Sequence, residues 1–89
     1  MRAVITVIGR DMVGILAKIS NACAEVNINI IEVTQSVLQD MFAMIMLVDI
    51  SKLKGDFSDI VYQMNELGET MGLSVHVMHE DIFNSMHRV

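Results

Sequence analysis

The fold is decided by a joint between a strand and a helix, VITVIGRDMVGIL at residues 4–16. A β-branched run ends at Gly9, a short loop carries Asp11, and Gly14 opens an apolar helical pattern. Such a joint leaves free backbone N–H groups at the start of the helix, which favour an anion, while Asp11 favours a cation. The pair suits a small zwitterion such as a free amino acid. The same residues also suit a purely structural joint, with Asp11 as helix N-cap and the glycines as turn residues.

Hydrophobic periodicity predicts the other elements. Apolar residues recur every three or four positions in two segments, which indicates two amphipathic helices. Asp56 is the expected N-cap of the second helix and Gly72 its expected end, and Gln39-Asp40 is the expected hairpin turn. The predicted order is strand 2–8, helix 14–26, strand 30–38, strand 41–50, helix 57–71, strand 73–79 and a short helix 81–89.

This βαββαβ order predicts an α+β, ferredoxin-like sandwich. We expect an antiparallel sheet of strand order 4-1-3-2, two helices on one face, and a short C-terminal helix. The main domain should cover residues 1–80 and the helical tail residues 81–89. In the second strand, alternation predicts a polar face and an apolar face, with Glu32, Thr34 and Ser36 on one and Ile31, Val33 and Val37 on the other.

The third strand is apolar on both of its faces. Two helices cover one face only, so something else should cover the other. Either row of the strand could be the uncovered one: Phe42, Met44, Met46 and Val48, or Met41, Ala43, Ile45 and Leu47. The C-terminal helix and a second copy of the chain are the two candidates for the cover. We therefore expect a homodimer, formed either edge to edge or face to face.

Composition excludes several classes of function. The net charge of −5 and an aromatic content of 4% argue against nucleic-acid binding, which needs a basic surface and stacking side chains. No apolar run is long enough to span a membrane. The single cysteine, Cys23, is expected to be a core residue in a protein of the reducing cytoplasm. A hydrophobic content of 53% is high for one small domain and supports burial against a second chain.

The motif Gly9-x-Asp11-x-x-Gly14-Ile15 after a strand, a helix ending in Val26, and Asn27-Ile28-Asn29-Ile30 opening the next strand together resemble the ACT domain. The resemblance covers nearly the whole chain and is strongest to short stand-alone ACT proteins. It implies a regulatory module that pairs with a second copy and binds an amino acid or related carboxylate near the subunit interface. With no attached catalytic or DNA-binding domain, the output would pass through another protein.

The resemblance also implies which residues bind the effector. Asp11 would contact the ligand, Gly14 would permit close approach of the backbone, and the amide of Asn29 would contribute a polar contact. The full set is Gly9, Asp11, Met12, Val13, Gly14, Ile15, Asn29 and Ile30. Two departures bear on specificity: many members have Pro where Val13 stands, and some serine-binding members have His where Gly9 stands. Serine specificity is therefore not expected.

Catalysis is not expected, because the sequence shows no nucleophile–base pair, metal cluster or phosphate loop. We expect no cofactor and no metal. His76 and His79 lie three residues apart on one strand and should point to opposite faces, so they should not share an ion. The alternative function is that of an adaptor, a chain that dimerises and binds a protein without any small ligand.

Overall fold

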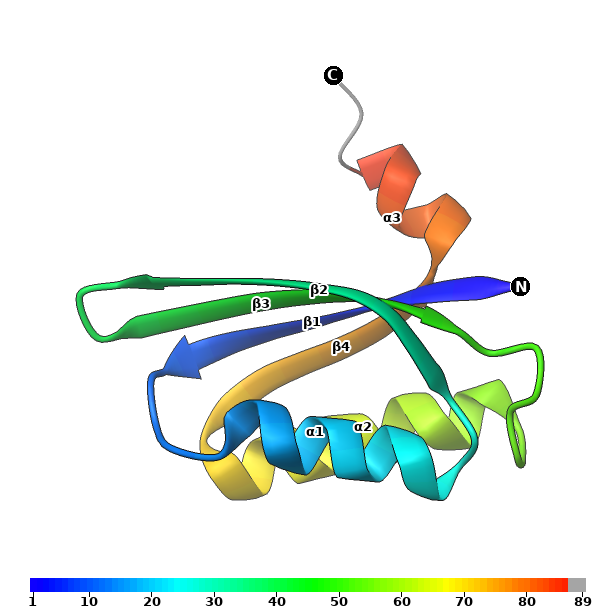
Figure 1. Cartoon of the computed structure of the whole chain (residues 1–89), viewed down its shortest axis with the longest axis horizontal. Helices are drawn as coiled ribbons and strands as arrows, with labels where there is room; N and C mark the ends of the chain where they lie inside the picture. Colours follow the sequence, from blue (N-terminus) through cyan, green and yellow to red (C-terminus); the bar gives the residue numbers. More distant parts are fainter. Residues whose placement is uncertain (87–89) are drawn as a thin grey trace.

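A computed structural model describes residues 1–86 and shows two layers, a sheet and a pair of helices (Figure 1). The elements, in chain order, are β1 Arg2–Arg10, α1 Ile15–Glu25, β2 Asn29–Leu38, β3 Met41–Asp49, α2 Phe57–Met71, β4 Leu73–His79 and α3 Glu80–Met86. The predicted ferredoxin-like order is confirmed. The end of the predicted C-terminal helix, including Val89, lies outside the described residues.

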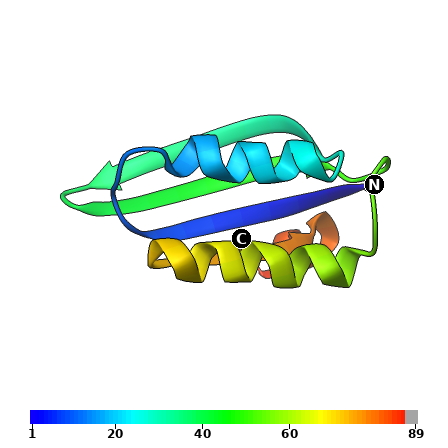
Figure 2. The ribbon, with the colours of Figure 1, turned by 90° about the horizontal axis from the view of Figure 1, so that it is seen from below.

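The sheet has the order β2-β3-β1-β4, as predicted, and all three neighbouring pairs are antiparallel. Helices α1 and α2 lie side by side on one face, whereas α3 rises from the opposite face (Figures 1 and 2). None of the described helices is long and apolar enough to cross a membrane.

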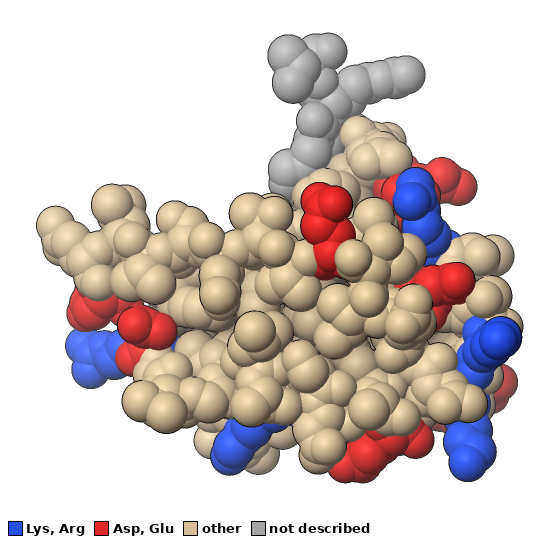
Figure 3. Space-filling model, viewed as in Figure 1, with Lys and Arg blue, Asp and Glu red and all other residues tan. Residues whose placement is uncertain are grey.

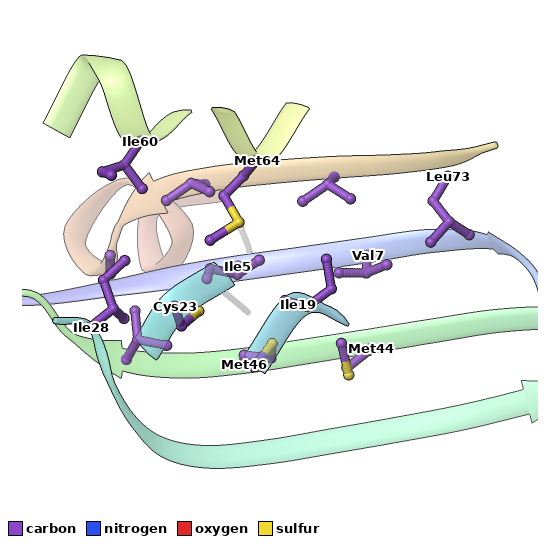
Figure 4. Packing of buried hydrophobic residues seen from close by; sticks show 14 of the residues in the cluster. Ile5, Val7, Ile19, Cys23, Ile28, Met44, Met46, Ile60, Met64 and Leu73 are labelled. Carbon is purple, nitrogen blue, oxygen red and sulfur yellow. The ribbon is translucent and has the colours of Figure 1, made fainter. Parts of the chain in front are cut away.

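The core fills the space between the sheet and the two long helices. Ile5 on β1, Ile19 on α1 and Met46 on β3 are fully buried there (Figure 4). Burying each such side chain stabilises the fold by about 1.5–3 kcal/mol relative to leaving it in water. Cys23 is part of this core, as predicted, and burial raises the pKa of its thiol to about 11.

The two faces of β3 have different surroundings. Its buried row, Phe42, Met44, Met46 and Val48, lies under the helices, and its other row, Met41, Ala43, Ile45 and Leu47, lies on the opposite face. Helix α3 packs on β1 and β4 and leaves Ile45 44% exposed. The uncovered row is therefore the one that begins at Met41, and α3 covers only part of that face.

A β-bulge in β2 makes one sequence prediction wrong. The register shifts between Ile30 and Glu32, so that Ile30 pairs with Val48 and Glu32 with Leu47. Ile30 consequently packs against the core, whereas Ile31 is 47% exposed. Simple alternation had grouped Ile31 with Val33 on the apolar face. A bulge inserts one residue and reverses the alternation on either side of it.

The predicted helix ends are confirmed in position. Asp56 is the N-cap residue of α2, although its side chain makes no capping hydrogen bond, and Gly72 ends the helix in the left-handed conformation at φ 71°. The hairpin turn between β2 and β3 lies at Gln39 and Asp40, with Gln39 at a positive φ of 58°.

Candidate functional site

The joint between β1 and α1 has an uncapped helix start. Gly14 is the N-cap residue at φ 90°, and no side chain caps the helix. The first helical hydrogen bond runs from the Lys18 N–H to the Gly14 carbonyl at 3.0 Å. The N–H groups of residues 15–17 therefore have no partner within the helix. The interpretation of Asp11 as an N-cap is wrong, because its side chain makes no such bond.

A backbone hydrogen bond holds the loop between β1 and α1 in place. The backbone N–H of Asp11 donates to the carbonyl oxygen of Asp40 at 2.8 Å, which ties the loop after β1 to the β2–β3 hairpin. Next to it, Arg10 and Asp40 form an ion pair at 3.7 Å. Both of these side chains are exposed, so the pair adds little stability. The carboxylate of Asp11 is exposed and makes no ion pair with any described residue.

A pocket of about 370 Å³ opens between this loop and the end of β2. Its lining residues come from three segments: Asp11, Met12 and Gly14 from the loop, Ile15 and Leu16 from α1, and Gln35, Ser36, Val37 and Phe42 from the β2–β3 hairpin. A carboxylate, uncapped N–H groups and the amide of Gln35 thus lie around one small volume. That set offers acceptors for an ammonium group and donors for a carboxylate.

The structure brings together four of the eight predicted site residues, namely Asp11, Met12, Gly14 and Ile15. Gly9 lies just before the pocket, where a Cβ atom would come within 2.5 Å of Leu73 Cδ2. Val13 is fully exposed and Ile30 packs against the core. The pocket residues that sequence reasoning missed, Leu16, Gln35, Ser36, Val37 and Phe42, are placed there by the register of the hairpin, which the sequence pattern does not specify.

Asn29 lies at the opposite end of β2 from the pocket. It lines a separate hollow of about 500 Å³ together with Asn27, Asp49 and Lys52, among others. Helix α1, with 11 residues, separates the two places by about 16 Å. Within one chain, Asn29 therefore does not reach the pocket beside Asp11.

The carboxylate that lines the hollow at Asn29 belongs to Asp49, and it already has bonding partners. Asp49 accepts a hydrogen bond from the Ser51 N–H at 2.8 Å and lies 4.0 Å from the N-terminal ammonium group. The bond from Ser51 is the main reason that the pKa of Asp49 is lowered. Because this carboxylate already has partners, the pocket at Asp11 is the better candidate for a ligand site.

The two histidines on β4 point to opposite faces, as predicted. The Ser74 hydroxyl and the His76 Nε2 lie 3.1 Å apart, and the His79 ring stacks on Phe57 of α2 at 4.3 Å. Among residues 1–86, no group of three or more His, Cys, Asp or Glu side chains is arranged to hold a metal ion.

The sequence pattern of the ACT domain matches residues 2–78, which include both long helices and every strand residue except His79. The chain belongs to the ACT domain family. A UPF0237 protein of Methanocaldococcus jannaschii is 49% identical over 88 residues, covering 99% of this chain and 98% of its own. One of Listeria innocua is 44% identical over the full length of both chains.

A solved structure of an ACT domain protein from Streptococcus pneumoniae matches with a TM-score of 0.81. It is 34% identical, and the match covers 98% of each chain. The likeness therefore includes α3 and extends beyond the residues that define the ACT domain itself.

Proposed function

We propose that this ACT domain is a non-catalytic regulatory module that binds a small amino acid or related carboxylate beside Asp11. Occupancy would be transmitted to a protein partner through a change in how two copies pack together. This is a shift between populated states and needs no chemical step. The proposed setting is the cytoplasm, where the lone thiol of Cys23 would remain reduced.

The pocket at the β1–α1 joint carries this proposal. A free amino acid presents an ammonium and a carboxylate within a few ångströms of each other. The Asp11 carboxylate would accept from the ammonium, and the N–H groups at the start of α1 would donate to the carboxylate. Gln35 would add a contact to the ligand from β2.

A second copy would complete the site. β2 is an edge strand, and no Pro or Lys interrupts its ten residues. Such an edge accepts pairing with another strand. Antiparallel pairing of two β2 strands around a two-fold axis would bring Asn29 of the partner subunit toward the end of β2 that bears Ser36. This arrangement would give Asn29 the ligand contact that it cannot make within its own chain.

The direct test is calorimetric titration with the twenty amino acids and small carboxylates, on the native chain and on two matched variants. Asp11→Asn removes the pocket carboxylate with little change in size, and Asp40→Asn removes an exposed acid outside the pocket. Binding should weaken in Asp11→Asn by about 1.5–3 kcal/mol, roughly 10- to 150-fold in Kd, and remain in Asp40→Asn. Equal affinity in all three proteins would refute the role of Asp11.

The adaptor function is the alternative, and one observation favours it. The loop and hairpin around the pocket expose apolar side chains, including Met12, Val13 and Leu38. Exposed apolar groups that gather in one place are typical of protein-binding surfaces. An adaptor would show no binding in the titrations and would lose its protein partner in a Val13→Asp variant, whereas Asp11→Asn would keep it.

A further inference from the structure

The outer side of the helix layer carries a groove that is separate from the pocket at Asp11. Figure 2 shows α1 and α2 from this side, next to each other and running in opposite directions. Each helix packs on the sheet, whereas the two helix backbones approach each other at few points. A hollow of about 430 Å³ lies between the two helices, and we call it the helix groove.

The floor of the helix groove is apolar. Ala22 and Val26 line it from the side of α1, and Met64 and Leu67 line it from α2. Met64 belongs to the core, and the other three are partly buried side chains that pack against the core. Covering apolar surface that still contacts water lowers the free energy, so this floor favours an apolar occupant.

The walls of the helix groove are polar and mainly acidic. Glu25 on α1 lines the groove itself, and Glu66 and Glu69 on α2 line an adjoining hollow of about 540 Å³. Along α1 and α2 there are four acidic residues, and Lys18 is the one basic residue. Neither Lys18 nor any of these acids forms an ion pair with a residue in the range 1–86. The acidic walls are therefore available to a basic partner.

The positive charges on this side lie toward the ends of the groove. The backbone N–H of Lys54 donates to the carbonyl oxygen of Val26 at 2.8 Å, so Lys54 lies at one end. Lys18 lies near the start of α1, at the other end. Figure 3 shows the same distribution on the lower surface of the molecule, where the helices lie, with acidic side chains between basic ones.

From this arrangement we infer that the helix groove binds a basic amphipathic helix of a partner protein. Such a helix presents apolar side chains at every third or fourth position, and these would contact Ala22 and Leu67 on the floor. Lys or Arg side chains on its flanks would pair with Glu25 and Glu66 on the two walls. Helix α1 has 11 residues and is about 16 Å long, which accommodates about three turns of the partner helix.

Charge selects this occupant over the alternatives. A second copy of the chain carries a net charge of −5 and would be repelled by the acidic walls. A nucleic acid would be repelled for the same reason, because its phosphates are negative. A basic helix is attracted to the walls, and this attraction also raises its rate of association.

The inference rests on the proposed function in one respect, namely that the regulatory module acts on a protein. It adds the surface used and the chemistry of the partner. Helix α1 connects the two sites, because Ile15 and Leu16 line the pocket at Asp11 whereas Lys18 and Ala22 line the helix groove. A ligand that shifts α1 would therefore also change the width of the groove.

The test is a titration with two synthetic peptides, followed by fluorescence anisotropy in the absence of any amino acid. Both peptides are amphipathic helices about 14 residues long with the same Leu face, which is slightly longer than the groove. One carries Lys on its flanks and the other carries Glu. The Lys peptide should bind the native chain at least about tenfold more tightly than the Glu peptide. Its affinity should fall as salt is added, because salt screens the charge pairs.

Variants of exposed wall residues locate the binding. The double variant Glu25→Gln, Glu66→Gln removes one acid from each wall, and Gln63→Arg places a cation between them. Glu32→Gln is the matched control, because Glu32 is an exposed acid that pairs with Leu47 on the opposite face of the sheet. The Lys peptide should bind about 3- to 30-fold more weakly to the double variant and to Gln63→Arg. Its affinity for Glu32→Gln should equal that for the native chain.

Four results would overturn the inference. They are no binding of the Lys peptide at millimolar concentration, equal binding of the two peptides, an equal loss of affinity in Glu32→Gln, and a native oligomer that Gln63→Arg alone dissociates. The last result, measured by light scattering, would assign the groove to a second copy. Amino-acid titration of the double variant separates this question from the proposed function, because affinity at the Asp11 pocket should persist there. Conversely, Asp11→Asn should retain the Lys peptide.

Discussion

Arg2 and Glu80 join the first strand to the last helix, with the guanidinium of Arg2 donating to both carboxylate oxygens of Glu80. The two residues lie 78 positions apart in the chain. A bidentate pair of this kind fixes orientation as well as position. It therefore sets where α3 stands above the sheet. The position of α3 in turn decides which part of the sheet face opposite α1 and α2 it covers.

Glu80→Gln should loosen α3 without unfolding the domain. The side chains of Arg2 and Glu80 are 48% and 26% exposed, so solvent screens the pair and its loss should cost at most about 1 kcal/mol. Amide hydrogen exchange should become faster in residues 80–86 and stay unchanged in β3. The difference in exchange rate between the native chain and Glu80→Gln should shrink at high salt, because salt weakens an ion pair but not apolar packing. Equal exchange in α3 of both proteins would contradict this role.

Val4→Ala should destabilise the fold although Val4 lies outside the main core. Its side chain is 3% exposed under α3, and removing two buried methyl groups costs about 1–3 kcal/mol. The matched control is Val37→Ala, an exposed position on β2, where we expect a change within about 0.5 kcal/mol. Urea unfolding measures both. Similar small losses in the two variants would mean that α3 does not seal Val4.

Sequence periodicity predicted the fold because α1 and α2 each have a clear amphipathic pattern and the segments between them are strand-like and bounded by turn residues. It went wrong at Ile31, since a bulge is a local backbone choice that leaves no mark in the alternation of side chains. Periodicity also did not decide which row of β3 faces away from α1 and α2, because both rows are apolar. Only the packing of the helices distinguishes them.

The candidate site was predicted in part for a related reason. Asp11 and Gly14 are neighbours in the chain, so the local motif places them together. Gln35 and Ser36 reach the same pocket through the pairing of β2 with β3, a long-range register that no local pattern encodes. The family resemblance associated Asn29 with Asp11. In the fold, Asn29 begins β2, whereas Asp11 lies beside the other end of that strand.

Gly9→Ala should destabilise the chain by a steric effect that a second mutation relieves. A Cβ atom at Gly9 would lie 2.5 Å from Leu73 Cδ2 and 3.3 Å from the Gly72 carbonyl oxygen. Overpacking of this kind costs about 1–3 kcal/mol. In a double-mutant cycle, Leu73→Ala should absorb part of that cost, so the two free-energy losses should sum to more than the loss in the double variant. Strict additivity would show that Leu73 is not the obstacle.

Cys23 should react slowly with thiol reagents and should make stability depend on alkaline pH. Burial raises the pKa of its thiol from 9.0 to about 11, so the folded state holds its proton more tightly than the unfolded chain. The resulting stabilisation is fully present below pH 9 and is lost as the pH rises through about 11. Comparing urea unfolding at pH 8 and pH 10.5 in the native chain and in Cys23→Ala isolates this effect from all other pH effects that the two proteins share. The native chain should lose more stability over that interval than Cys23→Ala, and alkylation of the thiol should accelerate on unfolding. An equal loss in both proteins would mean that the buried thiol contributes nothing to the pH dependence.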